Sequence, residues 1–178
     1  MRIWFVSVIT ASVLAASPVL AAKCGNTSAG FEAWKSSFAK EAKAAGVGQR
    51  GLAALSGASY AKRTIAADRN QKSFKYTLDK FLKVRGANTI ISLGRKRKAK
   101  SASYYAGLEK RFGVPAGVVI AIHGMETGFG NFMGDSNVIS AITTLAYDCR
   151  RSDFFTGHAL AALKLVDRGI ASPKSIGA

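Results

Sequence analysis

Hydrophobic residues recur along most of this chain at intervals of three and four, which is the spacing of one face of an α-helix. Phe31, Trp34, Phe38 and Ala42 form the clearest stripe, and Gly46 follows it as a helix stop. No segment alternates polar and apolar residues as a half-buried strand does. The pattern therefore predicts an all-α protein. The helical stripes cover residues 31–42, 49–55, 74–82, 88–112, 116–125, 137–147 and 152–166.

Two stretches need a separate interpretation. Residues 58–70 have no clear period and carry four charged side chains, which predicts an extended, solvated connection. Residues 88–112 are long enough for one helix or for two joined helices. The basic run at 95–100 is interpreted as a solvated face, with contact to an anionic polymer as the alternative. The buried side of this region is expected to consist of Ile90, Leu93, Tyr104, Leu108 and Phe112.

The N-terminus has the three parts of a secretory signal peptide. Arg2 supplies a positive start, residues 3–16 are apolar or small, and small residues at 19–22 follow a Ser-Pro break. The apolar stretch is shorter than the ~20 residues of a spanning helix. We therefore expect a signal peptide over residues 1–22, one domain over 23–178 and a periplasmic location. An uncleaved N-terminal anchor is the alternative.

The chain is strongly basic, and this bears on its partners rather than its fold. Its formal net charge is +16, and loss of the signal peptide removes only Arg2, leaving +15. In the cytoplasm such a charge would favour nucleic acid, but export argues against a nucleic-acid partner. Outside the inner membrane the available polyanions are anionic lipid and the cell wall. We expect a monomer whose basic surface contacts one of these.

The chain contains two cysteines, Cys24 and Cys149. In an oxidising compartment such a pair often forms a disulfide, and two independent thiols are the alternative. With His123 and His158 as the two histidines and no CxxC or HExxH pattern, we expect neither a metal site nor a cofactor.

The segment 116–125 is apolar around most of its circumference and is interrupted only by His123. A helix of this kind is usually buried. Glu126 follows at its C-terminal end, where burial and the helix dipole both favour the protonated carboxyl. Such an acid can donate a proton to a leaving sugar oxygen. A structural carboxylate that pairs with Arg150 or Arg151 is the competing interpretation, and these physical arguments leave both open.

The residues around Glu126 read Gly124-Met-Glu-Thr-Gly-Phe-Gly130, with Gly113-Val-Pro115 ahead of them. A helix that ends Leu-Ala-Tyr follows, and then the segment Arg150-Arg-Ser-Asp-Phe-Phe155. In this combination the chain resembles the membrane-bound lytic transglycosylase B family, which belongs to the lysozyme-like superfamily. The resemblance runs from about Cys24 to the last residue.

The resemblance implies a reaction and a set of roles. Glu126 matches the family's single catalytic glutamate, which protonates the bond between N-acetylmuramic acid and N-acetylglucosamine in peptidoglycan glycan strands. It then acts as a base on the 6-hydroxyl, so that a 1,6-anhydro ring closes without water. Arg150 and Arg151 match paired arginines placed to meet substrate acids, with an ordinary surface pair as the alternative. His123 departs from the family's usual aromatic or aliphatic residue; it could line the sugar pocket, although a satisfied, partly buried role is favoured.

The family's chains continue with a Gly-Ala-Met-Gly segment and further helices that wall the groove, whereas this sequence ends at Ala178. The resemblance therefore implies the N-terminal portion of the lysozyme-like fold, incomplete at its C-terminus. Three other hypotheses remain: a non-catalytic peptidoglycan-binding protein, a lysozyme-type muramidase that would use Asp135 as a second carboxylate, and, if the N-terminus stays in the cell, a DNA-binding protein.

Overall fold

The computed structural model describes residues 22–177, so all but the last residue of the predicted signal peptide lies outside the described part. The described part is predominantly helical, and the predicted all-α class is confirmed. The α-helices are α1 (Phe31–Ala44), α2 (Gln49–Ser56), α3 (Lys62–Arg69), α4 (Leu78–Val84), α5 (Ala87–Lys100), α6 (Ala102–Phe112), α7 (Ala116–Thr127), α8 (Val138–Tyr147) and α9 (Ser152–Asp167). Two 3-10 turns, η1 (Ser28–Gly30) and η2 (Lys72–Lys75), and two short antiparallel strands, β1 (Ser136–Asn137) and β2 (Ile176–Gly177), complete it.

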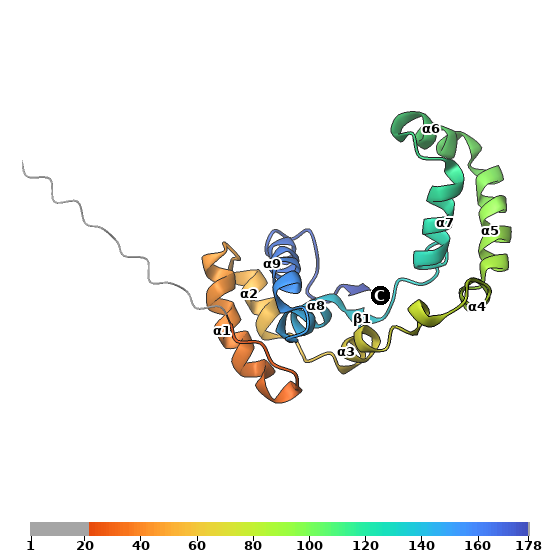
Figure 1. Ribbon diagram of the computed structural model, residues 1–178. Helices are drawn as coiled ribbons and strands as arrows, with labels where there is room; N and C mark the ends of the chain where they lie inside the picture. The colour runs from red at the N-terminus through yellow and green to blue at the C-terminus, as the bar shows by residue number, and fades with distance from the viewer. Residues whose placement is uncertain (1–21, 178) are drawn as a thin grey trace, which may run out of the picture.

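Figure 1 shows a curved molecule with two parts. We call α1, α2, α3, α8 and α9 the body, and α4 to α7 the arm. The arm extends away from the body, with α7 on its concave side and α5 on its convex side. In the described residues, no helix is both long enough and apolar enough to cross a bilayer.

The body is built on the stripe that the sequence predicts for the first helix. Phe31, Trp34 and Phe38 are at most 4% exposed and stack on one another along α1. They pack in one hydrophobic cluster with Leu55 of α2 and Leu163 of α9. Because these helices come from both ends of the described chain, long-range contacts hold the body together.

A buried lysine joins α1 to the end of α2. Lys35 is 7% exposed, and its ammonium group donates hydrogen bonds to the carbonyl oxygens of Ser56 (2.8 Å) and Ala58 (2.7 Å). It also pairs with Glu32 at 3.0 Å. The last carbonyls of a helix have no partner within the helix. Lys35 supplies a partner for the carbonyl of Ser56, the last residue of α2, and for that of Ala58 just beyond the helix.

The prediction for residues 58–70 was wrong in its second half, where α3 forms a helix over Lys62–Arg69. This helix buries one residue, Ile65, which explains why no periodic stripe is visible in its sequence. Its stability comes from contacts with α8 and from ion pairs at its C-terminal end. Tertiary packing of this kind routinely overrides local propensity.

In the arm, the helix expected over residues 74–82 begins only at Leu78 as α4, and Phe74 lies before it in η2. Residues 88–112 form the two helices α5 and α6, joined at Ser101. Of the five residues expected on the buried side, Ile90 and Leu108 are partly buried, whereas Leu93, Tyr104 and Phe112 are 39%, 63% and 60% exposed. The second cluster of buried residues instead uses Tyr105, Ala116, Ile120 and Phe129. The predicted solvated face at 95–100 is exposed throughout.

Candidate functional site

Glu126 lies in the last turn of α7, but the helix is not buried as expected. Only Ala116, Ile120 and Gly124 are buried, along the side that faces α5 and α6, while Ile122 is 58% exposed. The described part therefore covers α7 on one side only, and apolar residues on its other sides, such as Ile122, remain exposed. Glu126 itself is exposed, so burial by the protein does not supply the desolvation that the sequence argument assumed.

The turn that follows Glu126 is fixed by hydrogen bonds. The Thr127 hydroxyl donates to the carbonyl of His123 (3.1 Å) and accepts from the backbone N–H of Gly130 (2.9 Å). Gly128, Phe129 and Gly130 all have positive φ angles, of 55°, 63° and 88°. Glycine adopts this conformation freely, but for phenylalanine it is strained, so Phe129 must be held there by other contacts.

Phe129 is held by its ring and by its carbonyl group. The ring is 4% exposed and packs between α5 and α7, where a methyl group on Gly124 would lie 2.7 Å from Cζ. The Arg97 guanidinium lies 5.0 Å from the ring centroid and donates a hydrogen bond to the Phe129 carbonyl at 2.9 Å. The backbone one turn from Glu126 is therefore anchored on α5.

Sequence reasoning missed Arg97 and Phe129. The available signal was the bulky residue between two glycines at 128–130, because a large side chain at a site of positive φ requires a compensating contact. Arg97 belongs to the basic run, and nothing in that run distinguishes it from its neighbours.

His123 was expected to be partly buried, and the structure corrects this. Its side chain is exposed, and its ring meets the edge of Phe129 with centroids 5.5 Å apart. It lies one turn before Glu126 on α7, so the structure brings these two candidates to one end of the same helix.

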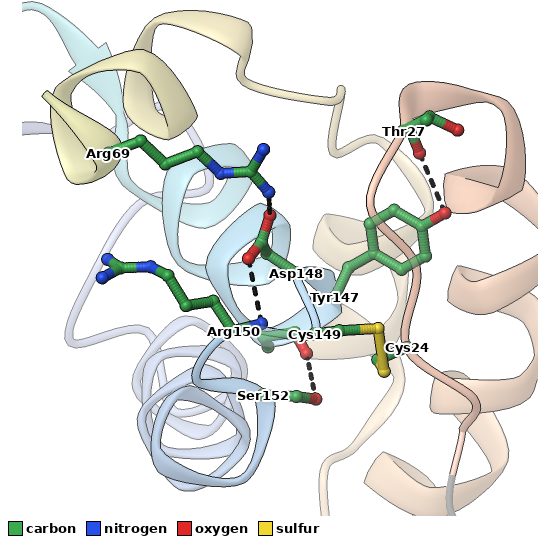
Figure 2. Close-up of a disulfide and its surroundings, with 9 residues drawn as sticks. Cys24, Thr27, Arg69, Tyr147, Asp148, Cys149, Arg150 and Ser152 are labelled. Atoms are coloured by element: carbon green, nitrogen blue, oxygen red, sulfur yellow. Dashed lines mark hydrogen bonds and ion pairs between the residues drawn. A yellow bond between two sulfur atoms is a disulfide. The ribbon is translucent and has the colours of Figure 1, made fainter.

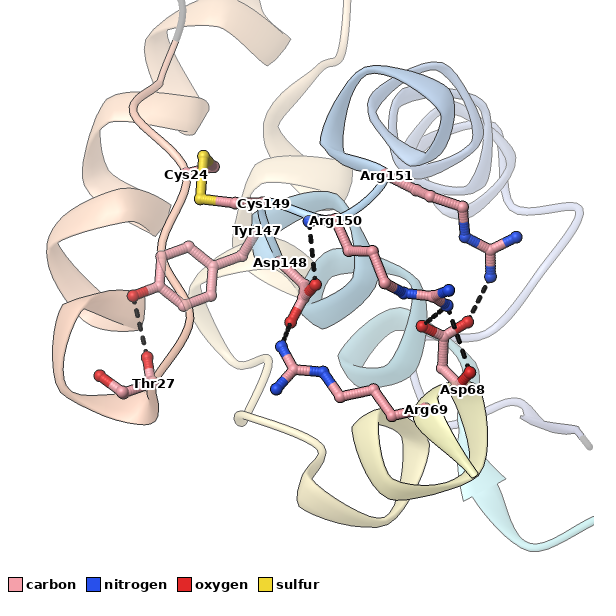
Figure 3. Close-up of polar contacts among 9 residues, drawn as sticks. All are labelled: Cys24, Thr27, Asp68, Arg69, Tyr147, Asp148, Cys149, Arg150 and Arg151. Atoms are coloured by element: carbon pink, nitrogen blue, oxygen red, sulfur yellow. Dashed lines mark hydrogen bonds and ion pairs between the residues drawn. A yellow bond between two sulfur atoms is a disulfide. The ribbon is translucent and has the colours of Figure 1, made fainter. Parts of the chain in front are cut away.

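Arg150 and Arg151 do not pair with Glu126. Both guanidinium groups contact Asp68 at the end of α3, as Figure 3 shows. This removes the alternative in which Glu126 is a structural partner of these arginines. Burial acts to raise the pKa of Asp68, whose side chain is 9% exposed, but hydrogen bonds and charge from both arginines outweigh it and lower that pKa. The arginines keep 45% and 42% of their side-chain surface exposed.

Asp68 was not among the predicted site residues, and no local pattern distinguishes it. It lines a cavity of about 480 Å³ between α3 and α8, together with Arg63, Thr64 and Gln71. Leu145 and Ile142 of α8 form its apolar wall. The arginine pair therefore contacts one residue of this cavity wall, Asp68, and belongs to the body, whereas Glu126 belongs to the arm.

The segment before the arginines is fixed by a disulfide between Cys24 and Cys149, shown in Figure 2. The backbone N–H of Gly25 donates to the carbonyl of Tyr147 at 2.9 Å, beside the disulfide. The Tyr147 hydroxyl donates to the carbonyl of Thr27 at 2.9 Å. The N-terminal segment is thereby tied to the end of α8.

Asp148 completes this junction. Its side chain is 3% exposed, and its Oδ2 atom pairs with Arg69 of α3. Its Oδ1 atom accepts a hydrogen bond from the backbone N–H of Arg150 at 3.1 Å. Because α3, the end of α8 and the start of α9 meet here, these contacts determine where Arg150 and Arg151 lie.

Known proteins resemble this chain in sequence and in fold. The model of the family described as transglycosylase SLT domain matches residues 30–178, which is most of the chain. The chain belongs to this family. The resemblance inferred from the residues around Glu126 is thereby confirmed, and family members are lytic murein transglycosylases.

Individual relatives support the assignment. SltB3 from Pseudomonas aeruginosa, solved in complex with NAG-anhNAM-pentapeptide, has a TM-score of 0.70 and 33% identity over 80% of this chain and 38% of its own. The same protein in complex with NAG-NAM-pentapeptide has a TM-score of 0.68 and 32% identity over 83% and 40%. Membrane-bound lytic murein transglycosylase B of Escherichia coli strain K12 is 36% identical over 48 residues, which are 26% of this chain and 13% of the relative.

The Escherichia coli lytic transglycosylase Slt35 in complex with bulgecin A shares the fold, with a TM-score of 0.62 and 19% identity over 88% of this chain and 51% of its own. The chain thus spans from about two fifths to about half of the length of these solved structures.

Proposed function

We propose that this protein is a peptidoglycan lytic transglycosylase with Glu126 as its acid and base. It would cleave the β-1,4 bond between N-acetylmuramic acid and N-acetylglucosamine without water. The observation that carries the proposal is the position of Glu126: an exposed carboxylate at the end of α7, next to an anchored turn, within the region that matches the family.

In the proposed reaction, protonated Glu126 gives its proton to the oxygen that leaves with N-acetylglucosamine. The resulting carboxylate takes the proton of the 6-hydroxyl of N-acetylmuramic acid, and that oxygen bonds to C1 to close the 1,6-anhydro ring. One carboxyl group supplies and recovers one proton, so the reaction needs no second carboxylate. The 6-hydroxyl oxygen takes the place of water, so no water is consumed. SltB3 has been solved with a product of this kind, NAG-anhNAM-pentapeptide, and this supports the proposal.

The exposure of Glu126 has a chemical consequence. A carboxyl group that a bound sugar covers loses its hydration, and loss of hydration favours the protonated form of a carboxyl group. We therefore propose that the bound glycan, and not the protein, removes water from the Glu126 carboxyl group. The fixed turn would contribute by holding the backbone beside Glu126, since positioning of a reacting group can contribute several orders of magnitude in rate.

The remaining predicted site residues receive narrower roles. We propose that His123, exposed one turn before Glu126, lines the sugar-binding surface. Arg150 and Arg151 would meet acidic groups of the substrate through the part of their surface that Asp68 leaves free. A charge on a fixed guanidinium attracts carboxylates at little entropic cost. We also propose export to the periplasm, by the signal peptide at residues 1–22.

The test is digestion of purified sacculi, with mass spectrometry of the released fragments. Anhydro products are expected, together with loss of release in Glu126→Gln. Asp135→Asn is the matched control, because Asp135 is an exposed acid nearby in sequence whose one described ion pair, with Arg63 at 3.0 Å, is on the surface.

Other results would contradict the proposal in distinct ways. Products one water heavier with free reducing ends, and loss of activity in Asp135→Asn, would indicate a lysozyme-type hydrolase. Binding to sacculi that weakens with salt, without release of fragments from the wild-type chain, would indicate a non-catalytic wall-binding protein.

A further inference from the structure

The positive charge of the protein is concentrated in one part of the chain. Residues 71–115 contain twelve Lys and Arg but two Asp and Glu, a net charge of +10 out of the total of +16. Residues 116–177 contain five of each kind and are neutral. The charge therefore belongs to η2, α4, α5 and α6, rather than to the helix that carries Glu126.

Within this region, residues 72–85 combine cations with exposed apolar side chains. They carry Lys72, Lys75, Lys80, Lys83 and Arg85 against one acid, a net charge of +4 in fourteen residues. Three large apolar side chains project into solvent among these cations: Phe74 is 87% exposed, Leu78 71% and Val84 62%. Helix α4 has no buried residue at all.

Along this segment two of the cations lie against aromatic rings. The Lys80 ammonium lies 4.8 Å from the centroid of the Tyr76 ring, and the Arg85 guanidinium lies 5.5 Å from that of Phe81. Leu78 and Leu82 lie one turn apart on the same side of α4, and Leu82 is 42% exposed. A short basic helix with exposed Phe and Leu has the composition of segments that lie in the plane of a membrane interface.

We infer that residues 72–85 dock on the surface of an anionic phospholipid bilayer. Phe74, Leu78 and Leu82 enter the interface between headgroups and acyl chains, and the five cations contact lipid phosphates. Figure 1 shows α4 at the base of the arm, next to the lower end of α5, whereas α7 lies on the concave side of the arm. The protein can therefore rest on a membrane while its candidate catalytic helix faces a substrate. The inference is independent of the chemistry proposed for Glu126.

The positive charge of this segment could also bind an anionic polymer. The exposed apolar side chains argue against that partner. A carboxylate polymer would pair with the lysines but would leave Phe74 and Leu78 in water. A bilayer accommodates the cations and the apolar side chains together, because it offers phosphates at its surface and hydrocarbon beneath. Each Lys or Arg near an anionic membrane contributes about 1 kcal/mol, so each lysine removed is expected to reduce partitioning roughly fivefold.

The experiment places an environment-sensitive dye on the full-length chain at Leu78→Cys. The matched control carries the dye at Ile170→Cys, because Ile170 is 70% exposed but belongs to the body. Both chains have the same N-terminal residues, so any contribution of that segment is common to them. The probes are vesicles of phosphatidylglycerol with phosphatidylcholine, vesicles of phosphatidylcholine alone, and polyglutamate.

A blue shift at position 78 with the anionic vesicles, absent at position 170 and absent with neutral vesicles, is expected. Replacing Lys72, Lys75, Lys80 and Lys83 by Gln should reduce vesicle partitioning by several hundredfold. Equal shifts at both positions, or none at 78, would overturn the inference. Polyglutamate binding that competes with vesicles while the dye at 78 stays in water would show a polymer-binding surface instead.

Discussion

Gly124→Ala tests whether the packing of α7 on α5 holds the turn after Glu126. A methyl group at Gly124 would lie 2.6 Å from Cγ2 of Ile90 and 2.7 Å from Cζ of Phe129. Both distances are below normal carbon–carbon contact, so α5 or the turn has to move. Overpacking of this kind costs about 1–3 kcal/mol, whereas replacing a helical glycine by alanine gains about 1 kcal/mol.

The two effects are separated by a control in the neighbouring helix. Gly107 lies inside α6, and a methyl group there would meet nothing within 4 Å. Gly107→Ala is therefore expected to raise the free energy of unfolding by about 1 kcal/mol. Because the propensity gain is common to both variants, the difference between them measures the overpacking, about 1–3 kcal/mol in favour of Gly107→Ala.

The assay is urea unfolding followed by circular dichroism, together with hydrogen exchange of the α7 amides to localise the effect. For a chain of this size, 1 kcal/mol corresponds to a change in Tm of about 2–4 °C. Under the proposed function, Gly124→Ala should also lower the rate of sacculus digestion by up to about a hundredfold, because the turn beside Glu126 shifts. If Gly124→Ala stabilises the protein as much as Gly107→Ala does, the anchoring of the turn on α5 is refuted.

Three further predictions concern the body. Arg69→Ala should lower the free energy of unfolding by roughly 3 kcal/mol, measured by urea titration, because it leaves the Asp148 carboxylate buried without its partner. Reduction of Cys24–Cys149, which lie 125 residues apart, should lower it by roughly 4–5 kcal/mol in the loop-entropy model, seen as a lower Tm with reductant. Because the pKa of Asp68 is lowered in the folded state, its ionised carboxylate adds to the free energy of unfolding above about pH 4. This contribution is lost as the pH falls through the folded-state pKa. Asp68→Asn should therefore be less stable than wild type at pH 7 and differ less at pH 3; an unchanged gap would contradict the assignment.

Most helices could be predicted because each carries its own periodic stripe. The residues 31, 34, 38 and 42 form one face of α1 whatever surrounds them, and the glycine-rich turn after Glu126 marks the end of α7 in the sequence. The position of the candidate acid was predictable for the same local reason: a motif of adjacent residues identifies it.

The helix α3, the coverage of α7 and the ion pairs could not be predicted in this way, because they depend on residues that are distant in the sequence. Helix α3 buries one side chain and depends on partners about 80 residues away, so its stripe is too weak to detect. The apolar circumference of α7 predicted a buried helix. How much of a helix is buried depends on how many helices pack against it, and here α5 and α6 cover only one side of α7. Local patterns determine most of the segments that become helices, with α3 as the exception, and they determine which residue types are adjacent. Long-range packing places Asp68 between Arg150 and Arg151, and it leaves Glu126 in contact with solvent.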